Sequence, residues 1–173
     1  MSQPHQPASP SVPPFTTSCD LSWVPQGQWS EDICFIKEHG FPVQRDFIFS
    51  YLSAESNPNI RAIKQGQRLF YSGHVSSISL LCQGEYFYYR VTVLPSMKMK
   101  KYTPTFMIAK QGSKHKVTRA YCDCMGGITG ACVHIATSLY ALAYISDKPV
   151  PNRALASLGI ALASLSCQWL PAQ

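Results

Sequence analysis

Four stretches of the chain have the hydrophobic character that is typical of β-strands. They cover residues 75–82, 86–94, 105–110 and 117–121, and they are rich in β-branched and aromatic side chains. Residues that favour turns separate them, at Gln83-Gly84, Pro95-Ser96 and Gly112-Ser113. Because short turns join strands that run in opposite directions, the pattern predicts a small antiparallel sheet of three or four strands.

The residues before this sheet have the wider spacing of hydrophobic side chains that is typical of short helices. Ser30 precedes two acidic residues and is expected to cap a first helix, which Gly40 and Pro42 would end. A second helix is expected through a hydrophobic stripe at positions 47, 48, 51 and 52. The region from residue 21 to about residue 65 is therefore predicted to consist of short helices.

Helical spacing returns after the last predicted strand. Ile135, Leu139 and Leu142 form one stripe of a helix expected over residues 134–145, which Pro149 would end. Residues 149–173 contain an Ala-, Leu- and Ser-rich stretch that predicts either a linker or a C-terminal helix. Residues 1–20 are rich in proline and poor in hydrophobic side chains, so they bury too little surface to fold and a disordered tail is expected.

Three thiols and one imidazole lie within thirteen residues, between the last strand and the following helix. They are Cys122, Cys124, Cys132 and His134, spaced as C-x-C, seven residues, C-x-H. Three thiolates and one histidine nitrogen make a complete tetrahedral donor set for Zn²⁺. The sequence therefore predicts a zinc site.

The spacing also predicts how the chain would hold the metal. Side chains alternate faces in an extended segment, so Cys122 and Cys124 would point the same way and Asp123 the other. Residues two apart on a helix diverge by about 200°, so Cys132 is expected in the loop before the helix and His134 on its first turn. Three glycines lie between the two pairs and permit tight turns. The predicted unit is a strand, a glycine-rich knuckle and a helix, with the metal at the joint.

The clustered cysteines are less well suited to core packing, to disulfides or to catalysis. Buried cysteines need no ligand, but the residues between the two pairs are small, which suits a chelating loop better than a packed core. A disulfide framework is disfavoured because no secretory signal is apparent, and the seven cysteines suit a reducing, intracellular compartment, with the nucleus as a candidate. A zinc with four protein ligands has no open position for water, so no enzymatic activity is expected.

The elements and the ligands together predict an α+β fold with a ββα-like zinc finger. The expected organisation is a tail (1–20), a short helical region (21–65), a sheet with the finger (66–148, finger core 117–145) and a linker or C-terminal helix (149–173). With 46% hydrophobic and 14% charged residues the composition is that of a globular domain. No hydrophobic run reaches the roughly 18 residues that span a bilayer, so no membrane contact is expected.

The ligand pattern and its surroundings resemble the SWIM-type zinc finger. Beyond the ligands, the matching stretches are residues 73–78, 88–97, 120–124, 132–134, 139–142 and 164–169. The likeness is closest to an animal group in which the finger precedes a YqaJ-like viral recombinase domain. Met125-Gly126-Gly127 stands where that group usually has Pro-Ala-Gly, which leaves the ligands intact. The chain ends where the recombinase domain would begin, so its nuclease activity is not expected here.

Two classes of partner remain open. The net charge of +6 favours nucleic acid, and DNA above all, as the partner. The occurrence of SWIM fingers in transposases favours the same partner. The candidate phosphate-binding residues flank the strands that lead to the finger: Lys98, Lys100, Lys101, Lys114, Lys116 and Arg119. The aromatic run at positions 86–89 could stack on bases, although aromatic side chains in strands more often pack in a core. The low charged fraction, and the finger's presence in ubiquitin-pathway proteins, favour a protein–protein interaction module instead.

Overall fold

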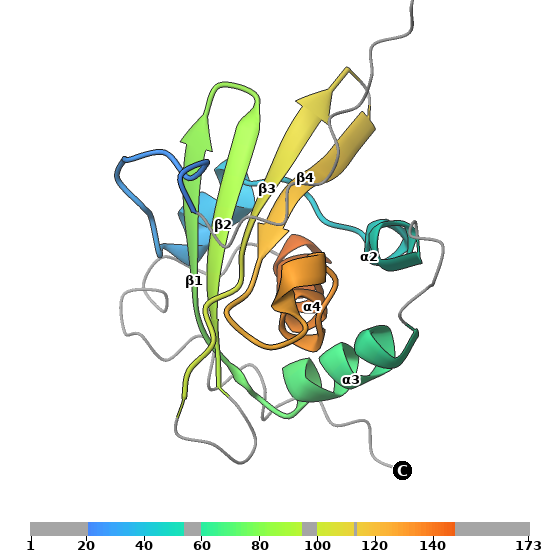
Figure 1. Cartoon of the computed structure of the whole chain (residues 1–173). Helices are drawn as coiled ribbons and strands as arrows, with labels where there is room; N and C mark the ends of the chain where they lie inside the picture. Colours follow the sequence, from blue (N-terminus) through green and yellow to red (C-terminus); the bar gives the residue numbers. More distant parts are fainter. Residues whose placement is uncertain (1–20, 54–59, 95–99, 113, 148–173) are drawn as a thin grey trace, which may run out of the picture.

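The structure of the chain is a computed structural model that describes residues 21–53, 60–94, 100–112 and 114–147. Within these residues the chain folds as an α+β domain (Figure 1). The elements in chain order are α1 (Ile33–His39), α2 (Arg45–Ser53), α3 (Ile60–Tyr71), β1 (Val75–Gln83), β2 (Tyr86–Val93), β3 (Thr105–Gln111), β4 (Lys114–Tyr121), the 3₁₀ turn η1 (Gly127–Thr129) and α4 (Val133–Asp147). The tail and the C-terminal segment predicted from the sequence lie outside the described residues.

The four strands form one antiparallel sheet in the order β1-β2-β3-β4, as predicted. Gly84 and Gly112 take positive φ values of 59° and 62° in the turns, where a residue without a side chain is favoured. The register of β3 and β4 shifts by one residue after Met107, where Thr118 is the extra residue of a bulge. Strand β4 begins three residues earlier than the sequence predicted, and its other end leads directly into the cysteine-rich segment.

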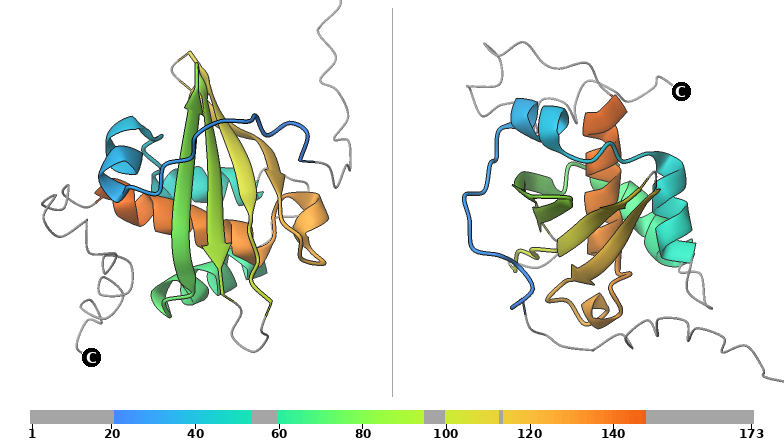
Figure 2. Two further views of the ribbon diagram at one scale, coloured as in Figure 1. Left: turned by 90° about the vertical axis from the view of Figure 1, so that its left-hand side faces the viewer. Right: turned by 90° about the horizontal axis from the view of Figure 1, so that it is seen from above.

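Helix α4 is the centre of the fold. It lies across one face of the sheet, with α2 and α3 beside it (Figures 1 and 2). The predicted stripe of Ile135, Leu139 and Leu142 is buried, but so is almost every other side chain from residue 135 to residue 145. The hydroxyls of Thr137 and Ser138 can be buried because each donates to a carbonyl one turn earlier, at 2.8 Å in both cases.

The segment before α1 crosses the opposite face of the sheet (Figure 2). Ser30 does not cap α1, contrary to the sequence-based prediction, because its backbone pairs with Leu80 of β1 through two hydrogen bonds of 2.9 Å. Asp32 caps α1 instead, and its Oδ1 accepts from the backbone N–H of Cys34 at 2.9 Å. Pairing with the sheet edge therefore outweighs the local preference of serine for the cap position.

Helix α3 was not recognised as a separate element from the sequence, and it extends past residue 65. Its buried residues are Ala62, Ile63 and Gly66. A side-chain carbon built on Gly66 would lie 2.5 Å from Cβ of Ala136, so glycine at this position lets α3 and α4 approach closely. Arg61, Lys64 and Arg68 are exposed on the opposite face, so the sequence of this segment does carry a helical pattern of charged and hydrophobic positions, which the prediction of two short helices left out.

The aromatic run of β2 is mostly structural. Tyr88 and Tyr89 are buried and Phe87 packs against the core, whereas Tyr86 is 45% exposed. The run therefore does not form a continuous surface for stacking on bases, in agreement with the expectation that strand aromatics pack internally.

Candidate metal centre

The four predicted ligands come together where β4 ends and α4 begins. Cys122 follows the last residue of β4, Cys124 lies two residues further, and Cys132 immediately precedes α4, whose second residue is His134. The three sulfurs and the nearest ring nitrogen all lie within 4.8 Å of one another, so the cluster could hold a metal ion. Cys132 precedes the helix and His134 lies in its first turn, as the sequence predicted.

Glycine makes the knuckle between the two ligand pairs possible. A side-chain carbon built on Gly127 would fall 1.8 Å from the carbonyl oxygen of Cys122, so no larger residue fits without moving that backbone. Gly130 ends η1 with φ of 69°, a conformation that favours glycine. Its carbonyl oxygen accepts a hydrogen bond of 2.6 Å from the Tyr51 hydroxyl of α2, which ties the knuckle to the helical layer.

The sulfurs differ in their exposure and in their protonation. Cys122 and Cys132 are 1% and 6% exposed, whereas Cys124 is partly exposed. Hydrogen bonds from the other two thiols, foremost that of Cys122, lower the pKa of Cys124. Hydrogen bonding to Cys124 and Cys132, together with burial, raises the pKa of Cys122. The hydrogen bond with Cys122 lowers the pKa of Cys132. The hydrogen bond with Cys124 and burial act in the opposite direction and outweigh it, so the pKa of Cys132 is raised to about 12.

These shifts describe a cluster that shares protons. Without a cation three thiolates at this distance repel one another, so one sulfur carries the charge and the others keep their protons. A bound metal ion removes this conflict, because its charge stabilises all three thiolates at once. Backbone N–H groups of Cys124 and Ile135 favour the thiolate forms of Cys122 and Cys132 respectively, and the second of these donors lies at the amino end of α4.

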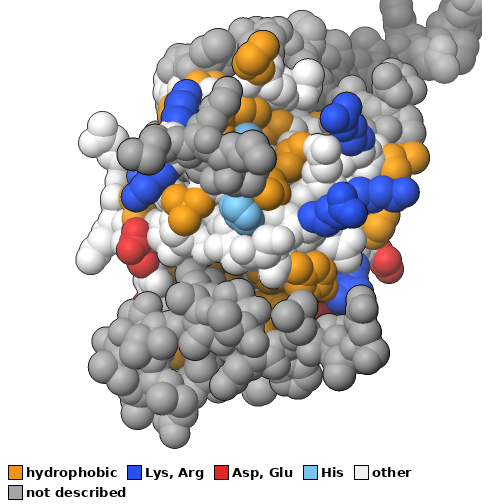
Figure 3. Space-filling model, turned by 90° about the horizontal axis from the view of Figure 1, so that it is seen from below, with side chains coloured by type: hydrophobic (Ala, Val, Ile, Leu, Met, Phe, Trp, Pro, Cys, Tyr) orange, Lys and Arg blue, Asp and Glu red, His pale blue; other side chains and the backbone are white. Residues whose placement is uncertain are grey.

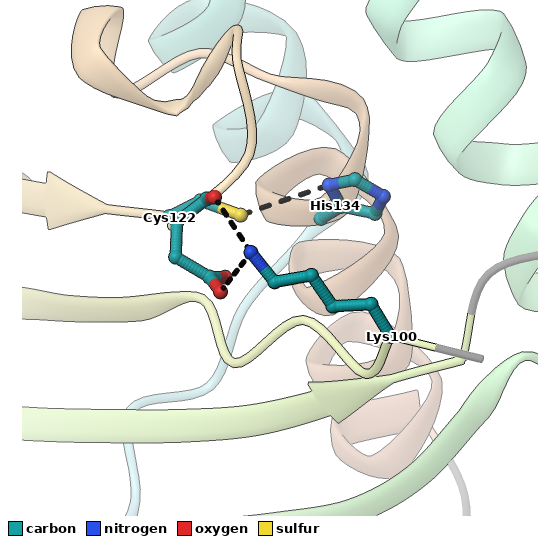
Figure 4. A network of polar contacts seen from close by, with 4 residues as sticks. Lys100, Cys122 and His134 are labelled. Carbon is teal, nitrogen blue, oxygen red and sulfur yellow. Dashed lines mark hydrogen bonds and ion pairs between the residues drawn. The ribbon is translucent and has the colours of Figure 1, made fainter. Parts of the chain in front are cut away.

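His134 is oriented by an aromatic side chain from another part of the chain. Nδ1 of His134 lies 3.6 Å from Sγ of Cys122 (Figure 4). The ring of Tyr102 stacks on the imidazole, with centroids 4.1 Å apart and planes inclined by 19°. Backbone hydrogen bonds of 2.8 and 3.0 Å to Val93 hold Tyr102 beside the end of β2. Tyr102 was not predicted as part of the site, because it lies 32 residues before the histidine and only the folded sheet brings the two rings together.

An ion pair links the segment before β3 to the ligand loop. Nζ of Lys100 lies 3.1 Å from the carboxylate of Asp123, the residue between the first two cysteines, and 3.5 Å from its carbonyl oxygen (Figure 4). The hydrogen bond to Asp123 raises the pKa of Lys100. The ammonium also lies 5.4 Å from the centroid of Tyr102. The carboxylate of Asp123 therefore pairs with a lysine and is not one of the four groups that cluster as candidate metal ligands.

The candidate phosphate-binding residues do not form one surface. Lys100 and Lys101 are exposed beside the metal cluster, whereas Lys116 is exposed five residues before the end of β4, roughly 17 Å along the strand. Arg119 is exposed on β4 between these two groups. Lys98 lies outside the described residues, and Lys114 begins β4 with a side chain that the structure does not describe.

Within the described part of the chain, every helix is too short or too polar to span a lipid bilayer. Comparison of the chain with models of protein families, with curated proteins and with solved structures found no match.

Proposed function

We propose that the chain is a zinc-binding module in which the metal joins β4 to α4. The observation that carries the proposal is the convergence of the three sulfurs and the imidazole within 4.8 Å. A tetrahedral Zn²⁺ with bonds of about 2.3 Å to sulfur and about 2.0–2.1 Å to nitrogen holds those two atoms about 3.6 Å apart. Sγ of Cys122 and Nδ1 of His134 are 3.6 Å apart, which supports a site of this size. Thiolate-rich donor sets also favour zinc over magnesium or calcium.

The zinc in this proposal is structural. Cys122, Cys124, Cys132 and His134 fill a tetrahedral shell and leave no position for a water or a substrate, so we propose no catalytic role. The C-x-C and C-x-H pairs, in a strand–knuckle–helix arrangement, support a finger of the SWIM type. Ligation would couple metal binding to the folding of the knuckle, because the loop between the pairs has little hydrophobic surface of its own.

Metal analysis of the purified chain tests the zinc proposal. We expect about one zinc per chain, released by a strong chelator or a thiol-modifying reagent and regained on addition of Zn²⁺. The Co²⁺-substituted chain should show the intense visible absorption bands of tetrahedral thiolate coordination. A chain that is fully folded with no bound metal, and that does not take up Zn²⁺ or Co²⁺, would refute the proposal.

We further propose that the module binds nucleic acid, duplex DNA in particular, with the surface beside the metal. The net charge of +6 supports a polyanionic partner. Lys100 and Lys101 place positive charge on the segment that covers the histidine ligand, and the side chain of Lys100 remains 58% exposed despite its ion pair. Lysines so close to the finger could contact phosphates, while the zinc holds in place the finger against which their segment packs. A DNA partner also implies a compartment that contains DNA, such as the nucleus.

Fluorescence anisotropy of a labelled DNA duplex with the zinc-loaded chain, repeated over a salt series, tests this second proposal. We expect affinity to fall linearly in log salt, and the K98A/K100A/K101A variant to bind more weakly with a shallower slope. The matched control is Asp123→Asn, which breaks the same ion pair but keeps every cation. It should bind at least as tightly as the parent chain if the lysines contact phosphates, and as weakly as the triple variant if the ion pair only supports the fold.

One observation favours the alternative of a protein partner. Met125, at the tip of the knuckle, is 101% exposed, and methionine is a side chain that adaptable protein-binding surfaces use often. If the zinc-loaded chain does not bind DNA even at low salt, a protein-interaction module becomes the better explanation. Met125→Lys is then the variant to compare with the parent chain against any identified partner.

A further inference from the structure

Helix α3 carries a stripe of positive charge on the face that it turns away from the core. Arg61, Lys64 and Arg68 are exposed, whereas Ala62, Ile63 and Gly66 are buried. At 100° per residue the three basic residues fall within about 60° of the helix circumference, opposite the buried face. We call these three residues the α3 stripe.

The charges of the α3 stripe have no compensating partner in the described structure. The twelve residues of α3 include no acidic side chain, and among the described residues none of the three cations forms an ion pair. Like charges three and four residues apart on a helix repel one another. Arg61 also lies in the first turn, where the helix dipole disfavours a cation. The stripe therefore works against the stability of the helix, and a role in binding an anion explains it better than packing does.

The helix that carries the stripe packs against the part of α4 that carries His134. Gly66 packs against Ala136 and Thr137, which lie within one turn of His134 on α4. Helix α3 and the segment before β3 both lie along the lower side of the molecule in Figure 1. Seen from below, Lys and Arg side chains gather on both flanks of this side, with histidine and hydrophobic side chains between them (Figure 3). Lys100 and Lys101 belong to the segment that pairs with Asp123 of the cysteine loop, and the α3 stripe belongs to the helix that packs on the first turns of α4.

We propose that the α3 stripe binds the phosphate backbone of duplex DNA. The inference rests on the proposed function and adds a second contact surface to it. From Arg61 to Arg68 the helix rises by about 10.5 Å, at 1.5 Å per residue. One DNA strand rises by about 3.4 Å per phosphate, so the stripe spans about three phosphates of one strand. A straight row of cations on a rigid helix matches a linear polyanion better than it matches a compact anionic ligand.

The test compares two double variants of the full zinc-loaded chain that remove the same charge from different surfaces. Lys64→Gln with Arg68→Gln removes two cations of the stripe, and glutamine keeps the helix propensity. Arg45→Gln with Lys110→Gln is the control, since Arg45 is exposed on α2 and Lys110 is exposed near the β3–β4 turn. Zinc content and thermal unfolding of each variant establish that the fold is retained, and affinity for a labelled duplex is measured by anisotropy from about 50 to 200 mM salt.

We expect the stripe variant to bind at least tenfold more weakly than the control at the higher salt. Two lost phosphate contacts should make the slope of log affinity against log salt shallower by about 1.8, and the addition of Arg61→Gln should bring the change to about 2.7. Equal affinities and slopes for the stripe variant and the control would overturn the inference while leaving the proposed function intact. A parent chain that does not bind DNA overturns both. Stripe-dependent binding to anionic lipid vesicles without binding to DNA would overturn the inference by assigning the surface to a membrane.

Discussion

The two ends of helix α4 are held in place by different means. Its later turns are packed on all sides, with Leu139 and Leu142 at 0% and 3% exposed. Its first turn carries His134, which is partly exposed and follows a knuckle built from glycines. Hydrophobic burial can hold the later turns without a metal, whereas the three clustered cysteines before and at the first turn cannot all ionise unless a cation joins them. The difference teaches that, with the proposed zinc in place, one helix would depend on packing at one end and on coordination at the other.

Removal of one candidate ligand should have the largest effect, and it should act on the first turn of α4 and not on the later turns. We expect Cys124→Ser to lose zinc and to lose amide exchange protection over residues 122–134, while residues 139–145 stay protected. Ligation contributes on the order of 10 kcal/mol in small zinc fingers, so the fall in the free energy of unfolding should be the largest of any single substitution. Cys34→Ser is the control, because Cys34 is buried in α1 outside the cluster. Full zinc content and unchanged protection in Cys124→Ser would show that the site is wrongly assigned.

The packed end can be weakened separately. Leu139→Ala leaves a cavity where the side chain is fully buried, and it should lower the free energy of unfolding by about 2–5 kcal/mol. Chemical denaturation of the zinc-loaded variant measures this loss, and metal analysis at low temperature should still find about one zinc per chain. If the affinity for zinc fell as steeply as the stability, the two ends would be a single cooperative unit and the contrast would not hold.

Acidity should act on the ligand end alone. The pKa of Cys122 is raised and that of Cys132 is raised to about 12, so in the metal-free chain both thiols keep their protons at neutral pH, whereas the lowered pKa of Cys124 leaves it ionised. Zinc must displace the two protons, so its affinity rises with pH and falls by about two decades for each unit of acidification. Competition with a chelator dye between pH 6.5 and 8 would measure the slope. A slope near zero would mean that the thiols are already ionised without metal.

The smallest effect should come from the knuckle itself. Gly127→Ala forces the backbone near Cys122 to move, and we expect the zinc-loaded chain to lose about 1–3 kcal/mol of stability, as overpacked sites do. Gly126→Ala is the matched control, because a side-chain carbon there meets its nearest neighbour, Cβ of Cys132, at an ordinary 3.7 Å. The melting temperatures of the two zinc-loaded variants make the comparison, and equal values would show that the close approach at Gly127 is unimportant.

Features with a local cause were the ones that the sequence could predict. The strands follow from runs of β-branched and aromatic side chains between turn residues, and the candidate metal ligands follow from three cysteines and a histidine within thirteen residues. Gly40 likewise ends α1 as expected, and its N–H bonds to the carbonyl of Ile36. In each case the residues that decide the structure are within a few positions of one another.

Features that depend on contacts between distant segments were missed. Ser30 pairs with a strand fifty residues away instead of capping a helix, and Tyr102 meets His134 only because the sheet is folded. Helix α3 buries Ala62 and Gly66, whose small size allows close packing on α4, a contact that the sequence of the segment alone does not show. The basic residues could be located in the sequence, but their division between separate surfaces depends on the strand register.

The burial of α4 on all sides has a consequence for how much the chain can vary in length. A helix that touches neighbours around its whole circumference cannot turn about its axis, so the core residues set the direction in which His134 points. One residue inserted between His134 and Leu139 would rotate the imidazole by about 100° and shift it by about 1.5 Å, away from the three sulfurs. The number of residues between the last ligand and the core should therefore tolerate insertion no better than the spacing of the cysteines does.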